Sequence, residues 1–520
     1  MKNLPIGIHT FSQLIEGNYL YVDKTKEIYN LIGRGGKYFF ISRPRRFGKS
    51  LMVSTLKEMF SGNKELFKGL WIYDKIEWET FPVIHIDFLK INGKTPGKLE
   101  KSLEKLIKKI GREYHIETDP ESDYKDVFGE FIEKLSRKNK AKVVILIDEY
   151  DKPIIDHLDS GDQDIAIENR KILKNFYSTI KGSDEYLKFA LLTGVSKFSR
   201  VSIFSDLNNL NDITIDEIYS TLLGYTEEEL LHYFPVGDTN GEKIEKIRKW
   251  YNGYSWDGKH FVYNPLSILL YFEKKRFANF WFSTGTPTFL INAIKEKEFP
   301  VKELENTEAD DSTFEIFDID NMEVTSLLFQ TGYLTIKKKK IIDDETIYYL
   351  SYPNKEVRES FLKHLLKAFS EKDFMVSRKY LKSLKLALHQ NKLDDFFASI
   401  KSFFASIPYN IFVSSREAYY HTIIYLLLRL SGVSVYPEKE TNIGRIDAVA
   451  EGENVIYIME LKIGTSEEAL NQIKEKRYYE PYLTSGKSIM LVGIGIDPSI
   501  RNIADYISEP FQNKLRLCRE

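Results

Sequence analysis

Three features are scarce in this sequence: cysteine, long apolar runs and net charge. The one cysteine, Cys518, has no partner for an internal disulfide and excludes a zinc site built from cysteines. The longest apolar run, residues 423–430, is far shorter than the roughly 20 residues that span a bilayer, and the first residues lack the apolar segment of a signal peptide. We therefore expect a cytoplasmic protein with no membrane partner.

The charge balance and the composition are those of a globular chain. The 74 Lys and Arg residues against 76 Asp and Glu residues give a net charge of −2, so no overall positive field attracts nucleic acid and any such contact must be local. Apolar residues make up 42% of the 520 residues, which is enough to build several hydrophobic cores and excludes a disordered chain.

Changes in periodicity divide this α/β multidomain chain into four parts. In residues 1–225, short apolar runs alternate with helical patterns, which predicts a parallel sheet with crossover helices. Residues 226–285 predict a helical lid, and residues 286–405 combine a helix and hairpin, as in a small winged-helix unit, with further helices. Residues 406–520 predict a compact α/β domain.

A phosphate-binding P-loop is predicted between the apolar strand 37–42 and the helical pattern that follows it. The N–H groups of a tight loop and the positive end of a helix suit phosphates, so Lys49 would neutralise the β and γ oxygens of ATP and Ser50 would bind Mg²⁺. Arg43 replaces the first glycine of the standard motif, and the alternative is a chance tripeptide at a helix start. The expected nucleotide-binding residues of this loop are Arg46, Phe47, Gly48, Lys49 and Ser50.

The same loop carries three arginines, Arg43, Arg45 and Arg46. Guanidinium groups bind phosphate oxygens in pairs, so these side chains suit either a bound triphosphate or the backbone of DNA. The sequence leaves both alternatives open.

A second element supports the nucleotide site. The apolar run 143–147 ends in Asp148 and Glu149, and a carboxylate at the carboxyl end of a central parallel strand faces the phosphate crevice. Asp148 would hold Mg²⁺ and Glu149 would polarise the attacking water, whereas the alternative is a solvated acidic turn. Thr193, at the end of the next strand, is suited either to sense the γ-phosphate or simply to form a turn.

A cluster of two carboxylates and one amine is predicted near the end of the chain. Two apolar strands around a turn at 451–454 should form a hairpin that brings Asp447 opposite the region of Ile458, about one cross-strand step from Glu460. Because strand residues two apart share a face, Lys462 points the same way as Glu460. Mg²⁺ would bind between Asp447 and Glu460 while Lys462 activates water or stabilises a phosphodiester; the alternative is a solvated face with a cross-strand salt bridge.

Two helices flank this hairpin in the sequence. Gln472 and Lys476 are neighbours on the helix that follows it. Glu417 and His421 have the same spacing on the helix that precedes it, where a metal role is one option and packing of the histidine is the favoured one.

The first half of the chain resembles a known family. The segments Tyr21-Val22-Asp23-Lys24-Thr25, Ser42 to Ser50 (SRPRRFGKS) and Asp148-Glu149-Tyr150-Asp151 are similar to those of the AAA-ATPase-like family of bacterial proteins. In that family SRPRRFGKS is the usual loop, so the resemblance implies that Arg43 is a family trait. It also implies Mg²⁺-dependent ATP hydrolysis.

The last part of the chain resembles a second family. Gly444-Arg445-Ile446-Asp447, Glu460-Leu461-Lys462 and Gln472-Ile473 are similar to the motifs of the PD-(D/E)XK nuclease superfamily, although Ile446 stands where the Pro of the name would be. The resemblance implies a restriction-endonuclease-like domain that cleaves phosphodiester bonds with a metal ion.

Two hypotheses follow for the function. In the first, the chain is an ATPase and a Mg²⁺-dependent nuclease that cleaves nucleic acid under nucleotide control; DNA is favoured over RNA as the partner, although the sequence does not decide between them. In the second, it is a nucleotide-dependent switch or assembly protein whose nuclease-like domain is inactive and serves binding. The expected cofactors are ATP and Mg²⁺, and a homo-oligomer stays open.

Overall fold

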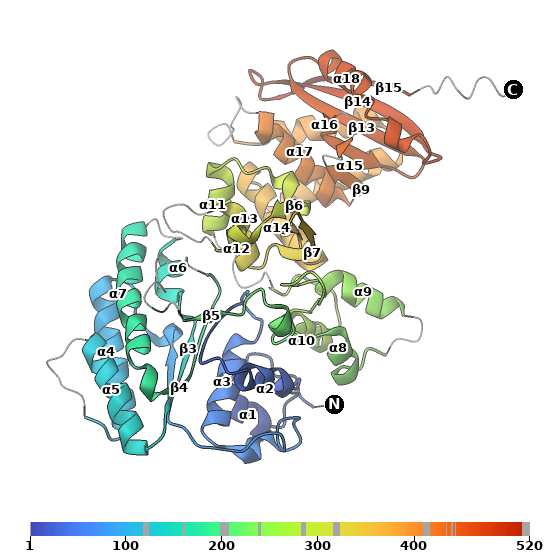
Figure 1. Cartoon of the computed structure of the whole chain (residues 1–520). Coiled ribbons are helices and arrows are strands. Elements are labelled where there is room, and N and C mark those ends of the chain that lie inside the picture. The colour runs from blue at the N-terminus through green and yellow to red at the C-terminus, as the bar shows by residue number, and fades with distance from the viewer. Residues whose placement is uncertain are drawn as a thin grey trace. The chain divides into compact units, whose positions relative to one another are not determined.

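The computed structural model describes residues 2–117, 124–158, 162–197, 207, 209–237, 241–281, 288–315, 323–408, 417–432, 434–437, 440–441 and 444–511. The chain forms two compact units (Figure 1). The first contains Met1–Leu290 and Asn306–Arg358, and the second contains Ile291–Glu305 and Glu359–Glu520. Each unit is described by itself.

A parallel sheet forms the centre of the first unit. Its order is β2-β3-β4-β1-β5, and every pairing in it is parallel, which confirms the predicted sheet. All six residues of β3 are buried, as its apolar sequence requires for a central strand. The strands are β1 (Tyr38–Ser42), β2 (Val83–Asp87), β3 (Val143–Asp148), β4 (Leu187–Gly194) and β5 (Asn211–Asp212).

Helices cover both faces of this sheet (Figure 1). Helix α4 shows why: Leu99, Leu103, Ile107 and Ile110 recur at helical spacing and are buried, while the charged residues between them face outward. The helices are α1 (Phe11–Glu16), α2 (Thr25–Gly33), α3 (Lys49–Phe60), α4 (Pro96–Glu113), α5 (Tyr124–Asn139), α6 (Lys152–Leu158) and α7 (Gln163–Gly182).

The helical lid follows the sheet. Its helices are α8 (Glu227–Tyr233), α9 (Glu242–Tyr251) and α10 (Pro265–Lys274). Asn264 caps α10 through its side chain and Pro265 occupies the first helical position, which together fix where the helix begins. The carboxylate of Glu356 accepts hydrogen bonds from the Ser267 hydroxyl and from the backbone N–H groups of Phe280 and Trp281, so it joins this lid to the start of the next helix.

The predicted hairpin is present as β7 and β8, and β6 adds a third strand to give an antiparallel sheet of order β6-β8-β7. The predicted helix precedes the hairpin. Asp343 and Asp344 both have positive φ, which is the geometry of a tight two-residue hairpin turn. The elements are β6 (Thr307–Ala309), α12 (Asp311–Glu315), α13 (Val324–Gln330), β7 (Thr335–Ile342) and β8 (Glu345–Ser351).

Helix α13 precedes the hairpin, in the position of the helix that reads DNA in a helix-turn-helix. All seven of its residues are buried. The side-chain oxygen of Gln330 also accepts a hydrogen bond from the backbone N–H of Lys197, at 2.8 Å. In this protein the helix therefore packs inside the first unit and presents no face to a DNA groove.

A mixed sheet of order β15-β14-β13-β12-β9 forms the second unit. Strands β13 and β14, which α18 connects in the chain, pair in parallel, and the other neighbouring strands are antiparallel. The strands are β9 (Ser434–Pro437), β12 (Ala448–Glu451), β13 (Val455–Ile463), β14 (Ser488–Asp497) and β15 (Asn502–Pro510), and a separate short pair is β10 (Glu440–Thr441) and β11 (Gly444–Arg445). The helices are α11 (Thr288–Glu296), α14 (Lys355–Ser370), α15 (Phe374–His389), α16 (Leu393–Ala405), α17 (Glu417–Ser431) and α18 (Ser466–Glu475), of which α11 and α14 begin in the first unit.

The loop between β1 and α3 is anchored by Arg43. Its guanidinium lies over the Trp256 ring, 3.8 Å from the centroid, and donates to the carbonyl oxygens of Ser42 (2.9 Å), Thr214 (2.7 Å) and Tyr219 (3.4 Å). Burial lowers the pKa of this guanidinium to about 9. Arg43 is 1% exposed, so it holds the loop in place and is not available to phosphate.

Replacing Arg43 by the glycine of the standard loop should therefore destabilise the protein. Arg43→Gly removes the ring contact and three hydrogen bonds and leaves a cavity, at a cost on the order of 2–4 kcal/mol. A thermal melt should show Tm lowered by several degrees. Arg45→Gly is the matched control, because Arg45 is exposed and its replacement by glycine adds the same freedom to the backbone of the unfolded chain. Equal Tm values for the two variants would contradict the anchoring role.

Candidate functional sites

The P-loop of the first unit turns at two residues with positive φ. Arg46 has φ 70° and Gly48 has φ 90°, and α3 begins directly after Gly48. A Cβ at Gly48 would meet nothing within 4 Å, so the glycine is required for its backbone angle and not for space. Phe47 is 1% exposed and packs edge-on against Tyr254 and Trp256, which fixes the loop from its inner side.

The ammonium group of Lys49 lies inside this loop. It donates to the carbonyl oxygens of Arg43 (2.9 Å) and Pro44 (3.3 Å) and lies 3.7 Å from a carboxylate oxygen of Glu149. The predicted lysine and the predicted water-activating carboxylate are therefore neighbours. Both line a cavity of about 480 Å³, together with Arg46, Phe47, Gly48 and Ser50.

The strands β3 and β4 end side by side, and this brings together two further predicted residues. The Thr193 hydroxyl donates to Asp148 at 2.6 Å, and both residues are buried. Neither residue lines the cavity itself. Thr193 thus contacts Asp148 and does not line the cavity. The role of Thr193 as a γ-phosphate sensor stays a prediction.

Asp151 is a cavity residue to which the sequence analysis gave no role. One of its carboxylate oxygens accepts hydrogen bonds from the backbone N–H groups of Val195 (3.0 Å) and Ser196 (2.7 Å) and from the Ser196 hydroxyl (2.6 Å). The other oxygen is buried without a hydrogen-bond partner among the described residues. Burial, and then the nearby charge of Glu149, raise the pKa of Asp151 to about 6.

Other cavity residues come from segments distant in the sequence. Apolar side chains of Pro5, Ile8, Pro265 and Leu269 form the wall away from the loop. The sequence signal for them was weak, because only long-range packing brings residues near the amino terminus and α10 to the loop. The two segments supply an apolar surface of the kind that a nucleotide base contacts.

The hairpin of the second unit forms where the sequence predicts it, with a register that differs by two residues. Ala448 pairs with Met459, so Asp447 lies opposite Glu460 itself and not opposite Ile458. The difference arises because the turn is centred on residues 453 and 454, where Gly452 N–H donates to the carbonyl oxygen of Val455, one residue later than a turn about 452 and 453. The two carboxylates are consequently closer than expected.

Asp447 and Glu460 are held face to face. The backbone N–H of Asp447 donates to Glu460 Oε2 at 3.4 Å, and the backbone N–H of Leu461 donates to Asp447 Oδ2 at 3.0 Å. Gln472 on α18 donates to the other oxygen of Glu460. Burial first, and then the charge of Asp447, raise the pKa of Glu460 to about 8, and burial also raises the pKa of Asp447.

Lys462 lies two residues after Glu460 on β13, so the two side chains share a face of the strand. Its positive charge offsets part of the rise that burial and Asp447 cause in the pKa of Glu460. The pKa of Glu417 is lowered first by its hydrogen bond with His421 and to a smaller extent by the charge of Lys462. The three residues that the sequence grouped as a cluster are thus brought together by the hairpin.

Two nitrogen-bearing side chains that the sequence analysis did not assign to the cluster also face Asp447. His421 Nδ1 lies 3.4 Å and Lys302 Nζ lies 4.0 Å from Asp447 Oδ1. The other ring nitrogen of His421 lies 3.3 Å from Glu417. The sequence analysis favoured a packing role for His421. This was wrong, because the ring links Glu417 to the carboxylate pair.

The comparisons with known proteins follow this division into two sites. A family model described as a predicted AAA-ATPase matches residues 5–204, and a model of the PD-(D/E)XK nuclease superfamily matches residues 415–506. The "Uncharacterized protein in vnfD 5'region" of Azotobacter chroococcum mcd 1 is 39% identical over 98% of this chain and 99% of its own length. The chain belongs to the family of AAA-ATPase-like proteins with a C-terminal PD-(D/E)XK domain. This confirms the resemblance of both halves.

A solved structure, Cdc6p from Pyrobaculum aerophilum, matches with 12% identity over 65% of this chain and 93% of that chain. Its TM-score is 0.18, so the fold assignment of the AAA-ATPase-like domain depends on its own sheet order and on the family match. Among the described residues, no helix is long and apolar enough to cross a membrane.

One further acidic cluster lies outside the two sites. Glu217, Asp257 and His260 come close enough to share an ion. Lys259 already binds Glu217 at 2.8 Å, and Asp257 accepts hydrogen bonds from Ser255, from the backbone and from His260. These contacts satisfy the carboxylates, so the PD-(D/E)XK pair is the better candidate for a metal ion.

The raised pKa of Glu460 gives a pH test. The pKa lies above the ordinary 4.5, so the metal-free protein loses stability as the pH rises from 4.5 to about 8. A divalent ion competes with the proton, so the increase in Tm caused by Mn²⁺ should be larger at about pH 8.5 than at about pH 6. Differential scanning fluorimetry measures this, with Glu460→Gln as the control that removes the pH dependence. An equal Mn²⁺ effect at both pH values in the parent protein would count against the pair as a metal site.

Proposed function

We propose that this protein hydrolyses ATP at its P-loop and cleaves phosphodiester bonds in nucleic acid, DNA rather than RNA, at the PD-(D/E)XK hairpin under nucleotide control. The observation that carries the proposal is the approach of the half-buried Asp447 to the buried Glu460, with the half-buried Lys462 on the same strand face as Glu460. Two carboxylates held this close repel each other unless a cation or a proton lies between them. A divalent cation there would also stabilise the charge on a phosphodiester under attack.

The residues of the first unit suit ATP and Mg²⁺. Lys49 would bind the β and γ oxygens, and the Ser50 hydroxyl and the Asp148 carboxylate would hold the ion, which offsets the phosphate charge. Glu149 lies on the cavity beside Lys49 and would orient the attacking water. Thr193 would fix the rotamer of Asp148 through its 2.6 Å hydrogen bond.

The residues of the hairpin suit a hard divalent cation. Carboxylate oxygens are the ligands that Mg²⁺ and Mn²⁺ prefer, and the pair Asp447 and Glu460 offers two of them. The ion would supply Lewis-acid stabilisation of the phosphate. Lys462, on the same face, would orient the attacking water or donate a hydrogen bond to a phosphate oxygen, and Gln472 would hold Glu460 in position.

A connected set of contacts supports nucleotide control. Thr193 and Asp151 hold the end of β4 against the nucleotide cavity, and Lys197, a few residues later, donates its backbone N–H to Gln330 on α13. The lid is bound to Glu356 at the start of α14, and the same helix continues into the second unit. Since α10 also lines the nucleotide cavity, a change there has a route through the hydrogen bond of Ser267 with Glu356 and along α14 toward the PD-(D/E)XK domain.

One observation favours the alternative, a switch or assembly protein with an inactive nuclease-like domain. His421 and Lys302 already lie within 4.0 Å of Asp447 and can offset its charge without a metal ion. In that case the cluster would be a salt-bridge network that serves binding.

The ATP site is tested by two substitutions. Lys49→Ala should weaken ATP binding by tenfold or more, because the phosphate charge loses its partner, whereas Glu149→Gln should keep binding and slow hydrolysis by about 10²-fold or more. Fluorescent-nucleotide titration and phosphate release measure the two effects. Lys57→Ala, on the exposed last turn of the same helix, is the control that should behave like the parent. If Lys49→Ala and Glu149→Gln both turn over ATP normally, the site is wrongly assigned.

The nuclease site is tested by plasmid nicking with Mg²⁺ or Mn²⁺, with and without ATP. Asp447→Asn and Glu460→Gln should abolish cleavage and the metal-induced increase in Tm. Lys462→Ala should lose cleavage by about 10²-fold or more yet keep that increase, because the amine is not a ligand.

Two controls accompany this assay. Lys487, which pairs with Glu451 at the other end of the hairpin, should tolerate replacement by Ala. Asp447→Asn should also retain ATP hydrolysis, since the two sites lie in different units. Absence of any metal effect on Tm, with unchanged nucleic-acid binding in all three site variants, would favour the switch.

A further inference from the structure

A cavity of about 340 Å³ lies within the second unit, next to the carboxylate pair. Its walls come from α11, from the turn Val301–Glu305 that follows it, from the end of α14 and from the first turns of α17. Its size is at the lower end of the range for small-molecule sites, roughly 300–1,000 Å³. No residue of this cavity has a role in the ATP site.

One wall of the cavity is the outer edge of the nuclease cluster. His421 lines the cavity, and its Nδ1 lies 3.4 Å from Asp447. Lys302 and Glu417 line it as well, and both also interact with the cluster. A phosphate bound at the carboxylate pair would therefore lie within one nucleotide of the cavity.

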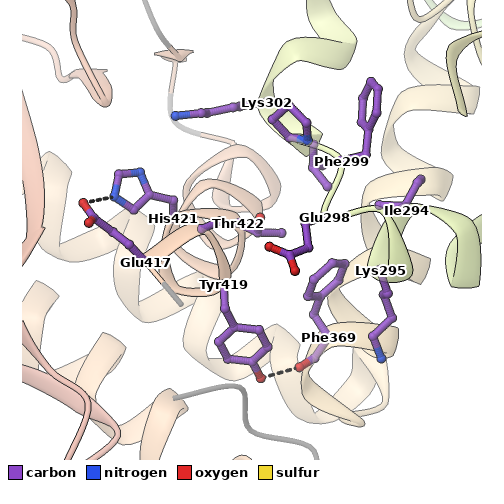
Figure 2. A pocket seen from close by; sticks show the side chains of 13 residues that line it. Ile294, Lys295, Glu298, Phe299, Lys302, Phe369, Glu417, Tyr419, His421 and Thr422 are labelled. Atoms are coloured by element: carbon purple, nitrogen blue, oxygen red, sulfur yellow. Dashed lines mark hydrogen bonds and ion pairs between the residues drawn. The ribbon is translucent and has the colours of Figure 1, made fainter. Parts of the chain in front are cut away.

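The opposite wall is apolar and aromatic. Figure 2 shows Ile294, Phe299 and Phe369 on the side of the cavity away from His421 and Glu417. The Tyr419 hydroxyl donates to the carbonyl oxygen of Phe369 at 2.7 Å, which ties α17 to the end of α14. The part of the wall formed by Phe369 is thus held against α17.

We propose that this cavity binds one unpaired base of the nucleic-acid strand whose phosphate lies at Asp447 and Glu460. A base has two flat apolar faces and a polar edge, which matches the aromatic wall of Phe299 and Phe369 and the polar groups of Thr422 and Glu298 on the same cavity. The inference depends on the proposed nuclease function, because it takes the phosphate position from that site.

The proposal determines the class of substrate. A base inside a duplex is stacked and paired, and it must leave the stack, at a cost of a few kcal/mol, before it can enter a cavity. Single strands, frayed ends and unpaired positions do not have this cost. The enzyme should therefore prefer single-stranded or locally unpaired nucleic acid.

Binding to two oligomers of equal length tests the cavity: oligothymidylate and a backbone whose residues are all abasic. The measurements use the full-length protein carrying Asp447→Asn, which prevents cleavage, and fluorescence anisotropy gives the affinity. With no further substitution, this protein should bind oligothymidylate more tightly than the abasic backbone. Phe299→Ala should reduce that preference by about tenfold, as expected for one lost base contact. Phe299→Trp should restore it, which excludes simple loss of folding.

A matched control separates the cavity from general aromatic binding. Phe374 is a half-buried phenylalanine of the same unit that does not line the cavity, so Phe374→Ala should leave the preference unchanged. An unchanged preference in Phe299→Ala, or the same loss in both variants, would overturn the proposal.

Cleavage by the protein with an intact Asp447 distinguishes this proposal from the nuclease assignment. Single strands should be cut faster than a fully paired duplex, and Phe299→Ala should reduce that ratio. If nothing is cut while the base preference still depends on Phe299, the nuclease assignment fails and the cavity remains a base-binding site. If Phe299→Ala changes neither the ratio of single-strand to duplex cleavage nor the preference for oligothymidylate, while cleavage still occurs, the cavity proposal alone fails.

Discussion

Buried carboxylates at the ends of central β-strands are the constraint on which both units depend. A charge removed from water costs several kcal/mol unless donors or an opposite charge compensate it. In the first unit the protein supplies that compensation: Thr193 donates to Asp148, the chain after β4 donates three hydrogen bonds to Asp151, and Lys49 lies beside Glu149. The end of β4 is consequently shaped around the carboxylates of β3.

The second unit compensates its carboxylates less completely. Asp447 accepts from the N–H of Leu461 and lies near His421 and Lys302, whereas among the described residues the hydrogen bonds to Glu460 are the weak 3.4 Å contact from Asp447 and the one from the amide of Gln472. The raised pKa of Glu460 reflects this deficit. Functional sites often keep such a local conflict, and here it is what makes a divalent ion or a proton favourable between the two side chains.

Much of the fold and part of the sites could be predicted because the signals are local. An apolar strand followed by Gly48-Lys49-Ser50, a strand ending in Asp148, and two strands around a short turn are each contained in a few consecutive residues. What could not be predicted depends on contacts between distant segments: the stacking of Arg43 on Trp256, and the approach of His421 and Lys302 to Asp447. The hairpin register was wrong by two residues because the strand pattern alone does not set the loop length.

The buried helix α13 shows how the winged-helix unit is used here. A helix that reads DNA needs an exposed face, whereas every residue of α13 is buried and Gln330 is bound to the backbone of Lys197. Lys197 directly follows Ser196, whose backbone N–H and hydroxyl donate to Asp151 of the nucleotide cavity. The helix is therefore packed against the segment that follows β4 and offers no exposed face to a DNA groove. Under the proposed function, the PD-(D/E)XK domain would be the part that binds nucleic acid.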